Sequence, residues 1–304
     1  MIEIAVCPGE NVLARAIAAL PANDEPAVLR LAPGTYREKV TLQRPYTTLE
    51  GSGAGETTIL WDDGALEILA DGMKRGTFRT ATLLVDAHHV TLRHLTVVNA
   101  AAPREQVGQA IALYADGDHF TCEDCTLCSH QDTLFTAPLP PKEIEKNGFI
   151  GPKQFAPRTP QRHTYRRCRI EGDVDFIFGG AAAWFEDCDI VSLAAGYATA
   201  ASTPEGQKFG YVFKDCRFLS EGAPENSCYL GRPWREFAQT VLLNCLIGPH
   251  IRPEGWHDWN KPVFHEQGIY AEYPAPTTQR APYARILTQE EAAQYTYENF
   301  INSL

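Results

Sequence analysis

The sequence predicts an all-β protein, a single-stranded parallel β-helix whose coils stack into a solenoid behind a short N-terminal capping helix. One observation is an alternating strand with a cysteine near its end, which recurs along the chain. Another is the scarcity of helical patterns, since most segments alternate with the period of two typical of strands. Repeated units of roughly 20 to 30 residues that each carry short strands indicate a solenoid, because such units bury their apolar faces by stacking. The repeated strands are FTCEDCTL, TYRRCRI, WFEDCDI, VFKDCRF and VLLNCLI.

The first expected element is a short helix near the N-terminus, with Asn11 as its cap. Its apolar positions fall on one face, which suits a helix that covers the end of a solenoid. These positions are Val12, Leu13, Ala16, Ile17 and Leu20.

The repeated cysteine occupies positions 125, 168, 188, 216 and 245, and Leu95 takes its place in VTLRHLTV. Equivalent positions of stacked coils form columns, so we expect a column of small, buried, reduced thiols. The chain has nine cysteines, an odd number, and lacks an export signal, so a disulfide framework is not expected. The cluster CEDCTLC lacks the second half that a zinc site needs.

One coil carries an insertion at about 136–162, TAPLPPKEIEKNGFIGPKQFAPRTPQR, which is rich in proline and hard to interpret as strand. Phe149, Ile150 and Phe155 give it apolar groups to bury, so we expect an ordered lobe. The remainder of 1–304 is expected to form a single β-helix domain, with a C-terminal tail at about 270–304.

Composition limits the partners that the protein can have. The formal net charge is −11, which argues against nucleic acid or an anionic membrane. No run of about 18 apolar residues predicts a membrane span. The first residues, MIEIAVCPGENVLARAIAALP, do not read as a signal peptide. We therefore expect a cytoplasmic monomer, or an extracellular protein if a leader has been removed.

The segment GDVDFIFGG places Asp175 inside an apolar strand, where a carboxylate is costly unless something compensates. Aligning CTLCSHQDTLF with CRIEGDVDFIF by their cysteines sets Asp132 beside Asp175. At a strand spacing of about 4.8 Å, two carboxylates cannot both ionise cheaply, so one should keep its proton. That arrangement suits a nucleophile beside a general acid. The alternative is a turn or polar ladder, as we expect for Asp124, Asp187 and Asp215.

Five motifs give the chain a resemblance to the pectin methylesterases, right-handed parallel β-helices of the pectin-lyase-like kind. The resemblance extends from about residue 11 to EGWHDWN at 254–260. It departs at SH before QDTL, where many members have glycine and an aromatic residue, and at the long insertion. The motifs are GTYRE (34–38), GQAIAL (108–113), SHQDTLF (129–135), GDVDFIFG (172–179) and YLGRPW (229–234).

The resemblance implies a carboxylic ester hydrolase that removes methyl groups from galacturonate units of pectin or of methylated oligogalacturonides, with no cofactor or metal. Asp175 would attack the ester carbonyl, and Asp132 would protonate the departing methanol and later activate water. Gln131 and Gln109 would donate to the oxyanion. Arg232 would keep Asp175 ionised through a bidentate pair.

Aromatic residues near these motifs are candidates for substrate binding. Trp234 would offer a face for a sugar ring, and Phe178, Trp256 and Phe135 are further candidates. Packing in the core or at the rim explains such residues about equally well. His130 is interpreted as structural or substrate-lining, because the mechanism assigns it no proton.

Three alternatives stay open. A pectate-lyase-like or polygalacturonase-like enzyme could use the same architecture, and a lyase would need Ca²⁺ held by several carboxylates. An esterase or thioesterase for another substrate could keep the same catalytic residues. A catalytically inactive carbohydrate-binding solenoid is disfavoured by the complete set of Asp, Gln and Arg. Because the lobe leaves the coil next to Asp132, we also expect short methylated oligogalacturonides to be preferred over polymer.

Overall fold

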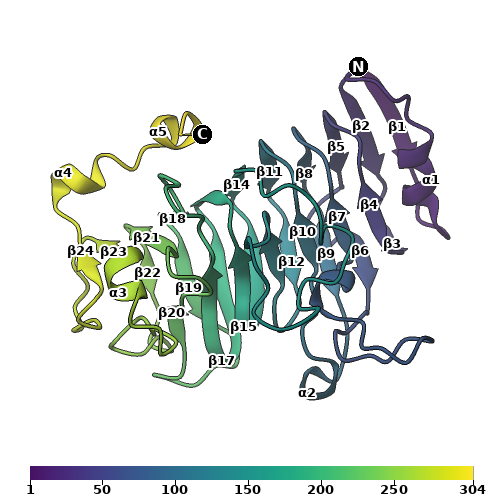
Figure 1. Cartoon of the computed structure of the whole chain (residues 1–304). Helices are drawn as coiled ribbons and strands as arrows, with labels where there is room; N and C mark the ends of the chain where they lie inside the picture. Colours follow the sequence, from purple (N-terminus) through teal and green to yellow (C-terminus); the bar gives the residue numbers. More distant parts are fainter. Residues whose placement is uncertain (304) are drawn as a thin grey trace.

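A computed structural model describes residues 1–303 and shows a right-handed parallel β-helix (Figure 1). The first face is one sheet of parallel strands that runs from the N-terminal to the C-terminal end. In spatial order its strands are β1 (Ile2–Val6), β2 (Ala27–Leu31), β5 (Thr47–Glu50), β8 (Thr91–Arg93), β11 (Phe120–Glu123), β14 (Arg162–Arg166), β16 (Ala182–Glu186), β18 (Tyr211–Lys214), β21 (Gln239–Leu243), β23 (Ile269–Tyr273) and β24 (Arg285–Ile286).

Two further faces share the long strands β15 (Arg169–Gly179) and β17 (Asp189–Ala201), whose two halves belong to different faces. The second face contains β3 (Gly34–Arg37), β6 (Thr57–Trp61), β9 (Thr96–Asn99), β12 (Thr126–Cys128), the first halves of β15 and β17, β19 (Arg217–Ser220) and β22 (Leu246–Ile247). The third contains β4 (Val40–Leu42), β7 (Leu83–Val85), β10 (Leu113–Ala115), β13 (Leu134–Thr136), the second halves, and β20 (Tyr229–Gly231). The predicted fold class is therefore confirmed.

The interior contains the expected column of cysteines. Leu95, Cys125, Cys168, Cys188 and Cys216 are all buried, and Cys245 is half-buried at the end of the column. The residue before each of them lies in the left-handed region, with φ between 49° and 57°, which turns the chain from the first face to the second. These turn residues are His94, Asp124, Arg167, Asp187, Asp215 and Asn244.

Helix α1 (Val12–Ala18) covers the N-terminal end, as expected, but the prediction that Asn11 caps it is wrong. Asn11 has φ 50° and makes no side-chain capping bond. Glu38 takes that role, because its carboxylate accepts from the backbone N–H groups of Leu13 (2.9 Å) and Ala14 (3.0 Å). A carboxylate there satisfies two unpaired N–H groups and complements the helix dipole.

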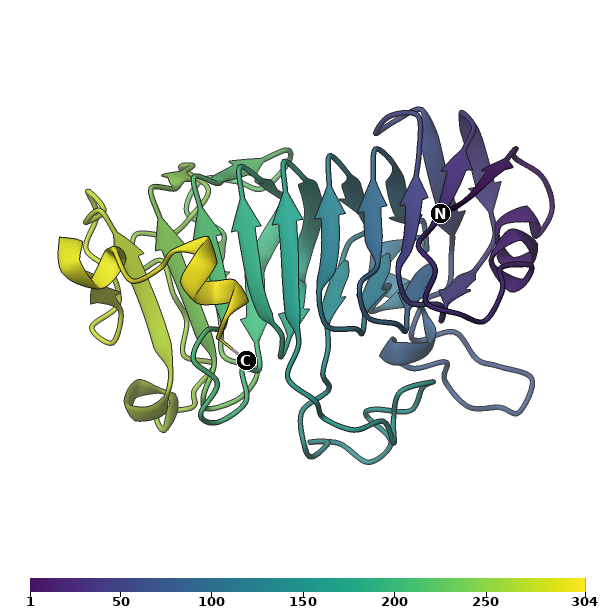
Figure 2. The ribbon, with the colours of Figure 1, turned by 90° about the horizontal axis from the view of Figure 1, so that it is seen from above.

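The insertion leaves the solenoid between β13 and β14 as a separate lobe (Figure 2). Phe149 is buried against Phe78, with ring centroids 5.8 Å apart. Phe155 is 91% exposed, so the expectation that it is buried is wrong. Polar contacts order this part of the lobe instead: Arg158 donates to four backbone carbonyls, and Lys153 pairs with Asp86.

The remaining helices are short and lie outside the coils. The chain after β23 folds back, and α5 packs on the first face (Figure 2). The ring centroid of Phe300 in α5 lies 5.6 Å from that of the buried Trp184. Since β23 is a regular strand of that face, the tail begins after Tyr273. The short helices outside the coils are η1 (a 3₁₀ helix, Thr77–Arg79), α2 (Arg104–Val107), α3 (Phe264–Gln267), α4 (Gln289–Ala292) and α5 (Tyr297–Ile301).

Within residues 1–303, no helix is long and apolar enough to cross a membrane. In the same part of the chain, no group of three or more His, Cys, Asp or Glu side chains is arranged to hold a metal ion.

Candidate active site

The two aspartates come from neighbouring coils of the third face. Strands β13 and β15 pair Leu134 with Ile177 and Phe135 with Phe178, so the predicted register is confirmed. Asp132 and Asp175 each lie two residues before the first of these pairs, and both have left-handed backbones, with φ 66° and 52°. The ladder between β15 and β17 shifts register around Asp175.

Both aspartates line one cavity of about 520 Å³ on this side of the solenoid. Gln109, Gln131 and Arg232 line the same cavity, so all five residues that the sequence assigned to catalysis are brought together. They come from successive coils far apart in the chain, which the stacking of the solenoid makes neighbours.

Arg232 fixes the carboxylate of Asp175. Its Nε lies 2.8 Å from Oδ1 and its Nη2 lies 2.7 Å from Oδ2, a bidentate ion pair. The guanidinium lies between two aromatic rings, 4.0 Å from the centroid of Tyr197 and 3.7 Å from that of Trp259. The two cation–π contacts hold the arginine in the orientation that the ion pair requires.

The two carboxyls differ in the surroundings that set their pKa values. Burial raises the pKa of Asp132 well above its ordinary value, and the nearby charge of Asp175 raises it further. Burial also raises the pKa of Asp175, but the hydrogen bonds and charge of Arg232 oppose that rise. Of the two carboxyls, Asp132 therefore holds a proton more strongly, and Asp175 is the one that ionises first.

The backbone of each glutamine is tied to the neighbouring coil. The carbonyl of Gln131 accepts from the N–H of Ala110 (3.0 Å), and the carbonyl of Gln109 accepts from the N–H of Ala65 (2.9 Å). Their side chains line the cavity beside the aspartates. Neutral amide N–H groups in this position can donate to an oxyanion without adding a charge to the cavity.

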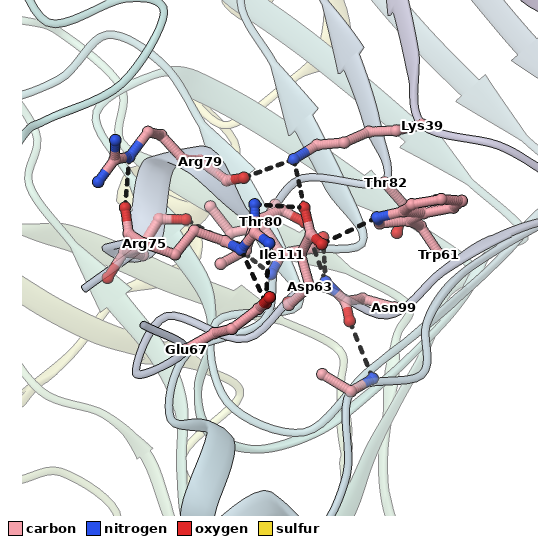
Figure 3. A network of polar contacts seen from close by, with 12 residues as sticks. Lys39, Trp61, Asp63, Glu67, Arg75, Arg79, Thr80, Thr82, Asn99 and Ile111 are labelled. Carbon is pink, nitrogen blue, oxygen red and sulfur yellow. Dashed lines mark hydrogen bonds and ion pairs between the residues drawn. The ribbon is translucent and has the colours of Figure 1, made fainter. Parts of the chain in front are cut away.

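The loop that follows β6 leads into η1, whose Thr77 and Phe78 complete one side of the cavity. Asp63 anchors this loop: it accepts from the indole N–H of Trp61 (2.9 Å) and from Lys39 (2.5 Å), and it pairs with Arg75 (3.0 Å) (Figure 3). With its carboxylate held from three directions, Asp63 fixes the start of the loop.

Asn99 joins the same loop to the coil that carries Gln109 (Figure 3). Its side-chain N–H groups donate to the carbonyls of Asp63 (3.0 Å), Thr80 (3.0 Å) and Ile111 (3.1 Å). Asn99 is buried, so breaking these bonds would leave unpaired polar groups in the interior.

Two of the four aromatic candidates for substrate binding reach the cavity, and two do not. Trp234 and Phe178 line the cavity. Phe135 is fully buried beneath Phe178, at a centroid distance of 4.8 Å, so the prediction that it contacts substrate is wrong. Trp256 is also wrong as a sugar platform. It is 1% exposed, stacks on Tyr270 at 4.3 Å and donates its indole N–H to a core carboxylate.

Sequence reasoning missed several residues that line the cavity. Trp259, three residues after the tryptophan that was chosen, lies against Arg232. Arg235 and Lys261 are also part of the lining. The position of Trp259 within EGWHDWN was the only available signal, because the sequence alone does not say which of two nearby tryptophans points into the core.

The chain is similar to known pectinesterases in both sequence and structure. The pectinesterase family model matches residues 9–139 and 158–303. The chain is 32% identical over 293 residues to pectinesterase QRT1 of Arabidopsis thaliana, covering 92% of this chain and 70% of that protein. It is 30% identical to pectinesterase 31 of the same plant, covering 90% and 83%. It spans about half of some longer relatives, such as 46% of the probable pectinesterase/pectinesterase inhibitor 64.

Solved structures agree. Pectin methylesterase PemA from Erwinia chrysanthemi superposes with a TM-score of 0.80 at 26% identity, covering 100% of this chain and 98% of that one. The carrot pectin methylesterase gives a TM-score of 0.79 at 26% identity, with 98% and 92% covered. A pectin methylesterase in complex with a hexasaccharide gives 0.77 at 27% identity, with 96% and 93% covered. These comparisons do not favour the lyase, polygalacturonase or thioesterase alternatives.

Proposed function

Because the chain belongs to the pectinesterase family, we propose that it hydrolyses the methyl esters of galacturonate units in pectin or methylated oligogalacturonides and releases methanol. The observation that carries this proposal is the buried pair of unlike carboxyls: Asp175 forms a bidentate ion pair with Arg232, and Asp132 beside it has a pKa raised well above its ordinary value. Such a pair supplies a nucleophile and an acid for acyl transfer.

Acylation begins when the Asp175 carboxylate attacks the ester carbonyl. The oxyanion accepts hydrogen bonds from the side-chain N–H groups of Gln109 and Gln131. As the bond to the methoxy oxygen breaks, Asp132 gives its proton to that oxygen and methanol leaves. The enzyme is left with a mixed anhydride between Asp175 and the uronate acyl group, and with Asp132 ionised.

Deacylation reverses the role of Asp132. Its carboxylate takes a proton from water, and the resulting hydroxide attacks the uronate acyl carbon. The anhydride bond breaks, which releases the galacturonic acid and restores the Asp175 carboxylate. The released acid then loses its proton to the solvent. Asp132 is protonated again and ready for the next ester.

The aromatic lining provides the sugar contacts. The rings of Trp234 and Phe178 lie 5.7 Å apart at the cavity wall. An apolar wall of this kind suits the C–H face of a pyranose ring. The hexasaccharide complex among the related structures supports an oligomeric galacturonan ligand.

The lobe is proposed to set substrate length in favour of short methylated oligogalacturonides. Its residues Ile144, Glu145, Gly148 and Phe149 line the cavity. The family model leaves 140–157 unmatched, so the lobe is a feature of this chain beyond the common pattern. Replacing 140–157 with a short Gly/Ser link should raise the ratio of activity on polymer to activity on oligomer. An unchanged ratio in a folded deletion variant would show that the lobe does not set length.

Other parts of the functional proposal stay predictions. They are a monomeric state, a cytoplasmic location, and the absence of nucleic-acid and membrane partners. Sedimentation and cell fractionation test the first two.

The test of the activity is methanol release from methylated oligogalacturonides and from methylated pectin. The proposal expects methanol from the wild type, no rise in the ultraviolet absorbance of unsaturated products, and no effect of a chelator. Unsaturated products lost on chelation would favour a lyase. A folded wild type that releases no methanol from either substrate would contradict the proposal.

A further inference from the structure

An ion pair between Arg104 and Asp173 links the first and the last of the three coils that carry the acid, the nucleophile and Gln109. Gln109 comes from the coil of β10, Asp132 from that of β13 and Asp175 from that of β15, and these strands pair in that order. Arg104 precedes β10, and Asp173 lies two residues before Asp175. The ion pair therefore reaches across the coil of Asp132, which lies between the other two.

The carboxylate of Asp173 is fixed on both sides. Asp173 is 5% exposed, its Oδ1 accepts from the N–H of Val174 (2.6 Å), and its Oδ2 accepts from Nη1 of Arg104 (3.0 Å). The N–H of Asp173 donates to the carbonyl of His130 (2.9 Å), and the N–H of Asp132 donates to the carbonyl of Val174 (3.1 Å). These backbone bonds tie the turn of one catalytic carboxyl to the turn of the other, so a displacement of Asp173 would disturb both.

The other end of the ion pair lies close to Gln109 in the chain. Arg104 begins α2, and only Gly108 separates the end of this helix from Gln109. Gly108 has φ 69°, and a Cβ there would lie 2.9 Å from the side chain of Leu66, so the connection is tightly packed. A displacement of Arg104 would therefore reach Gln109 through a short, constrained segment.

The charge of Asp173 also acts on Asp132. Burial has the largest effect on the pKa of Asp132, and the charges of Asp175 and Asp173 raise it further, against the opposing charge of Arg232. Arg104 carries the charge that offsets Asp173. The ion pair therefore contributes to the field in which Asp132 holds its proton.

Two other titratable groups lie beside the ion pair. Glu105 contacts Nε of Arg104 (2.9 Å) and is exposed, and His130 lies on the coil between the two partners. Solvent screens the charge of Glu105. On this side of Asp132, the buried carboxylate of Asp173 and its partner Arg104 are therefore the dominant charges.

We propose that Asp173 and Arg104 are positioning residues of the reaction, whose ion pair holds Gln109 and Asp132 in place relative to the nucleophile Asp175. This inference rests on the proposed function and goes beyond the five residues that carry out the chemistry. Within the described chain neither partner lines the cavity, so both act through other groups and not on the substrate.

Infrared titration of the full-length protein tests the ion pair without turnover. The band of the protonated Asp132 carboxyl, identified by its absence from Asp132→Asn, is followed against pH. Asp173→Asn removes a like charge and should move the titration to lower pH by roughly half a unit or more. Arg104→Gln removes the cation that offsets Asp173 and should move it to higher pH. An unchanged titration in either variant, or shifts in the same direction, would overturn the proposal.

Steady-state kinetics of methanol release test the positioning of Gln109. Arg104→Gln should lower kcat about tenfold and leave KM within about twofold, because an oxyanion donor acts mainly in the transition state. Arg104→Lys keeps the charge and should recover most of the rate. An unchanged kcat, or a loss that appears only in KM, would overturn the positioning role.

The matched control is the ion pair between Arg217 and Asp189, which also joins two coils (2.6 and 2.7 Å) and lies outside the cavity lining. Arg217→Gln and Asp189→Asn should leave both the titration and kcat unchanged. Equal effects in the control variants would reduce the result to the loss of any ion pair between coils and would overturn the proposal.

Failure of the proposed function would look different. If the Asp132 titration shifts as expected in Asp173→Asn and Arg104→Gln but the wild type releases no methanol, the ion pair is supported and the proposed function is contradicted. If the wild type releases methanol and the titration does not shift, the function stands and the positioning role fails.

Discussion

Two sets of aspartates in this solenoid share a backbone conformation but differ in environment. Asp124, Asp187 and Asp215 turn the chain at the surface with φ between 52° and 55°, close to the values of Asp132 and Asp175. Asp124 is paired with an arginine of the next coil at 2.8 Å, which lowers its pKa, whereas burial raises the pKa of Asp132. The left-handed backbone is therefore common to both sets. Burial between apolar neighbours is what distinguishes the carboxyls of the cavity from those of the surface turns.

The largest contrast should come from one substitution made in each set. Asp175→Asn removes the nucleophile and should lower methanol release at least about a thousandfold, or about 4 kcal/mol of barrier. Asp187→Asn keeps a residue that tolerates the left-handed turn and should leave the rate within about twofold. If Asp175→Asn retained more than about a tenth of the rate in a folded protein, the assignment of the nucleophile would be wrong.

The next effect concerns Asp132. Asp132→Asn removes the proton donor and should lower kcat by about a hundredfold or more. It should also change the pH–rate profile, because the wild-type rate declines at alkaline pH when Asp132 loses the proton that its raised pKa retains. Coupled carboxyls titrate as a pair, so the pH–rate profile is the quantity to measure. The same profile in wild type and variant would exclude Asp132 as the acid.

Sequence reasoning reached the parts of this comparison that depend on period and register. The cysteine column and the alignment of Asp132 with Asp175 follow from a repeat visible in the letters. Features set by how coils close in space were out of reach. The cap of α1 comes from Glu38, twenty residues beyond the end of the helix. Trp256 lies in the core, whereas Trp259 lies against Arg232 at the cavity.

A smaller effect should appear in stability, with opposite signs in the two sets. The folded-state pKa of Asp132 is raised, so its contribution to stability is present at acid pH and is lost as pH rises. Asp132→Asn should therefore raise the melting temperature at neutral pH, a trade of stability for function.

The folded-state pKa of Asp124 is lowered by Arg167, so its contribution is present at neutral pH and is lost as pH falls. Asp124→Asn should cost less than about 1 kcal/mol, as for exposed ion pairs. Thermal unfolding of both variants at several pH values checks the signs. Destabilisation by Asp132→Asn at neutral pH would contradict them.

The central claim is that Asp132 carries a proton while Asp175 does not. Infrared difference spectra at neutral pH test this directly, because a protonated carboxyl has a C=O stretch that a carboxylate lacks. The account predicts that a protonated-carboxyl band of the wild type is absent from Asp132→Asn and is retained in Asp175→Asn. Loss of that band in Asp175→Asn together with its persistence in Asp132→Asn would reverse the two roles and contradict the account.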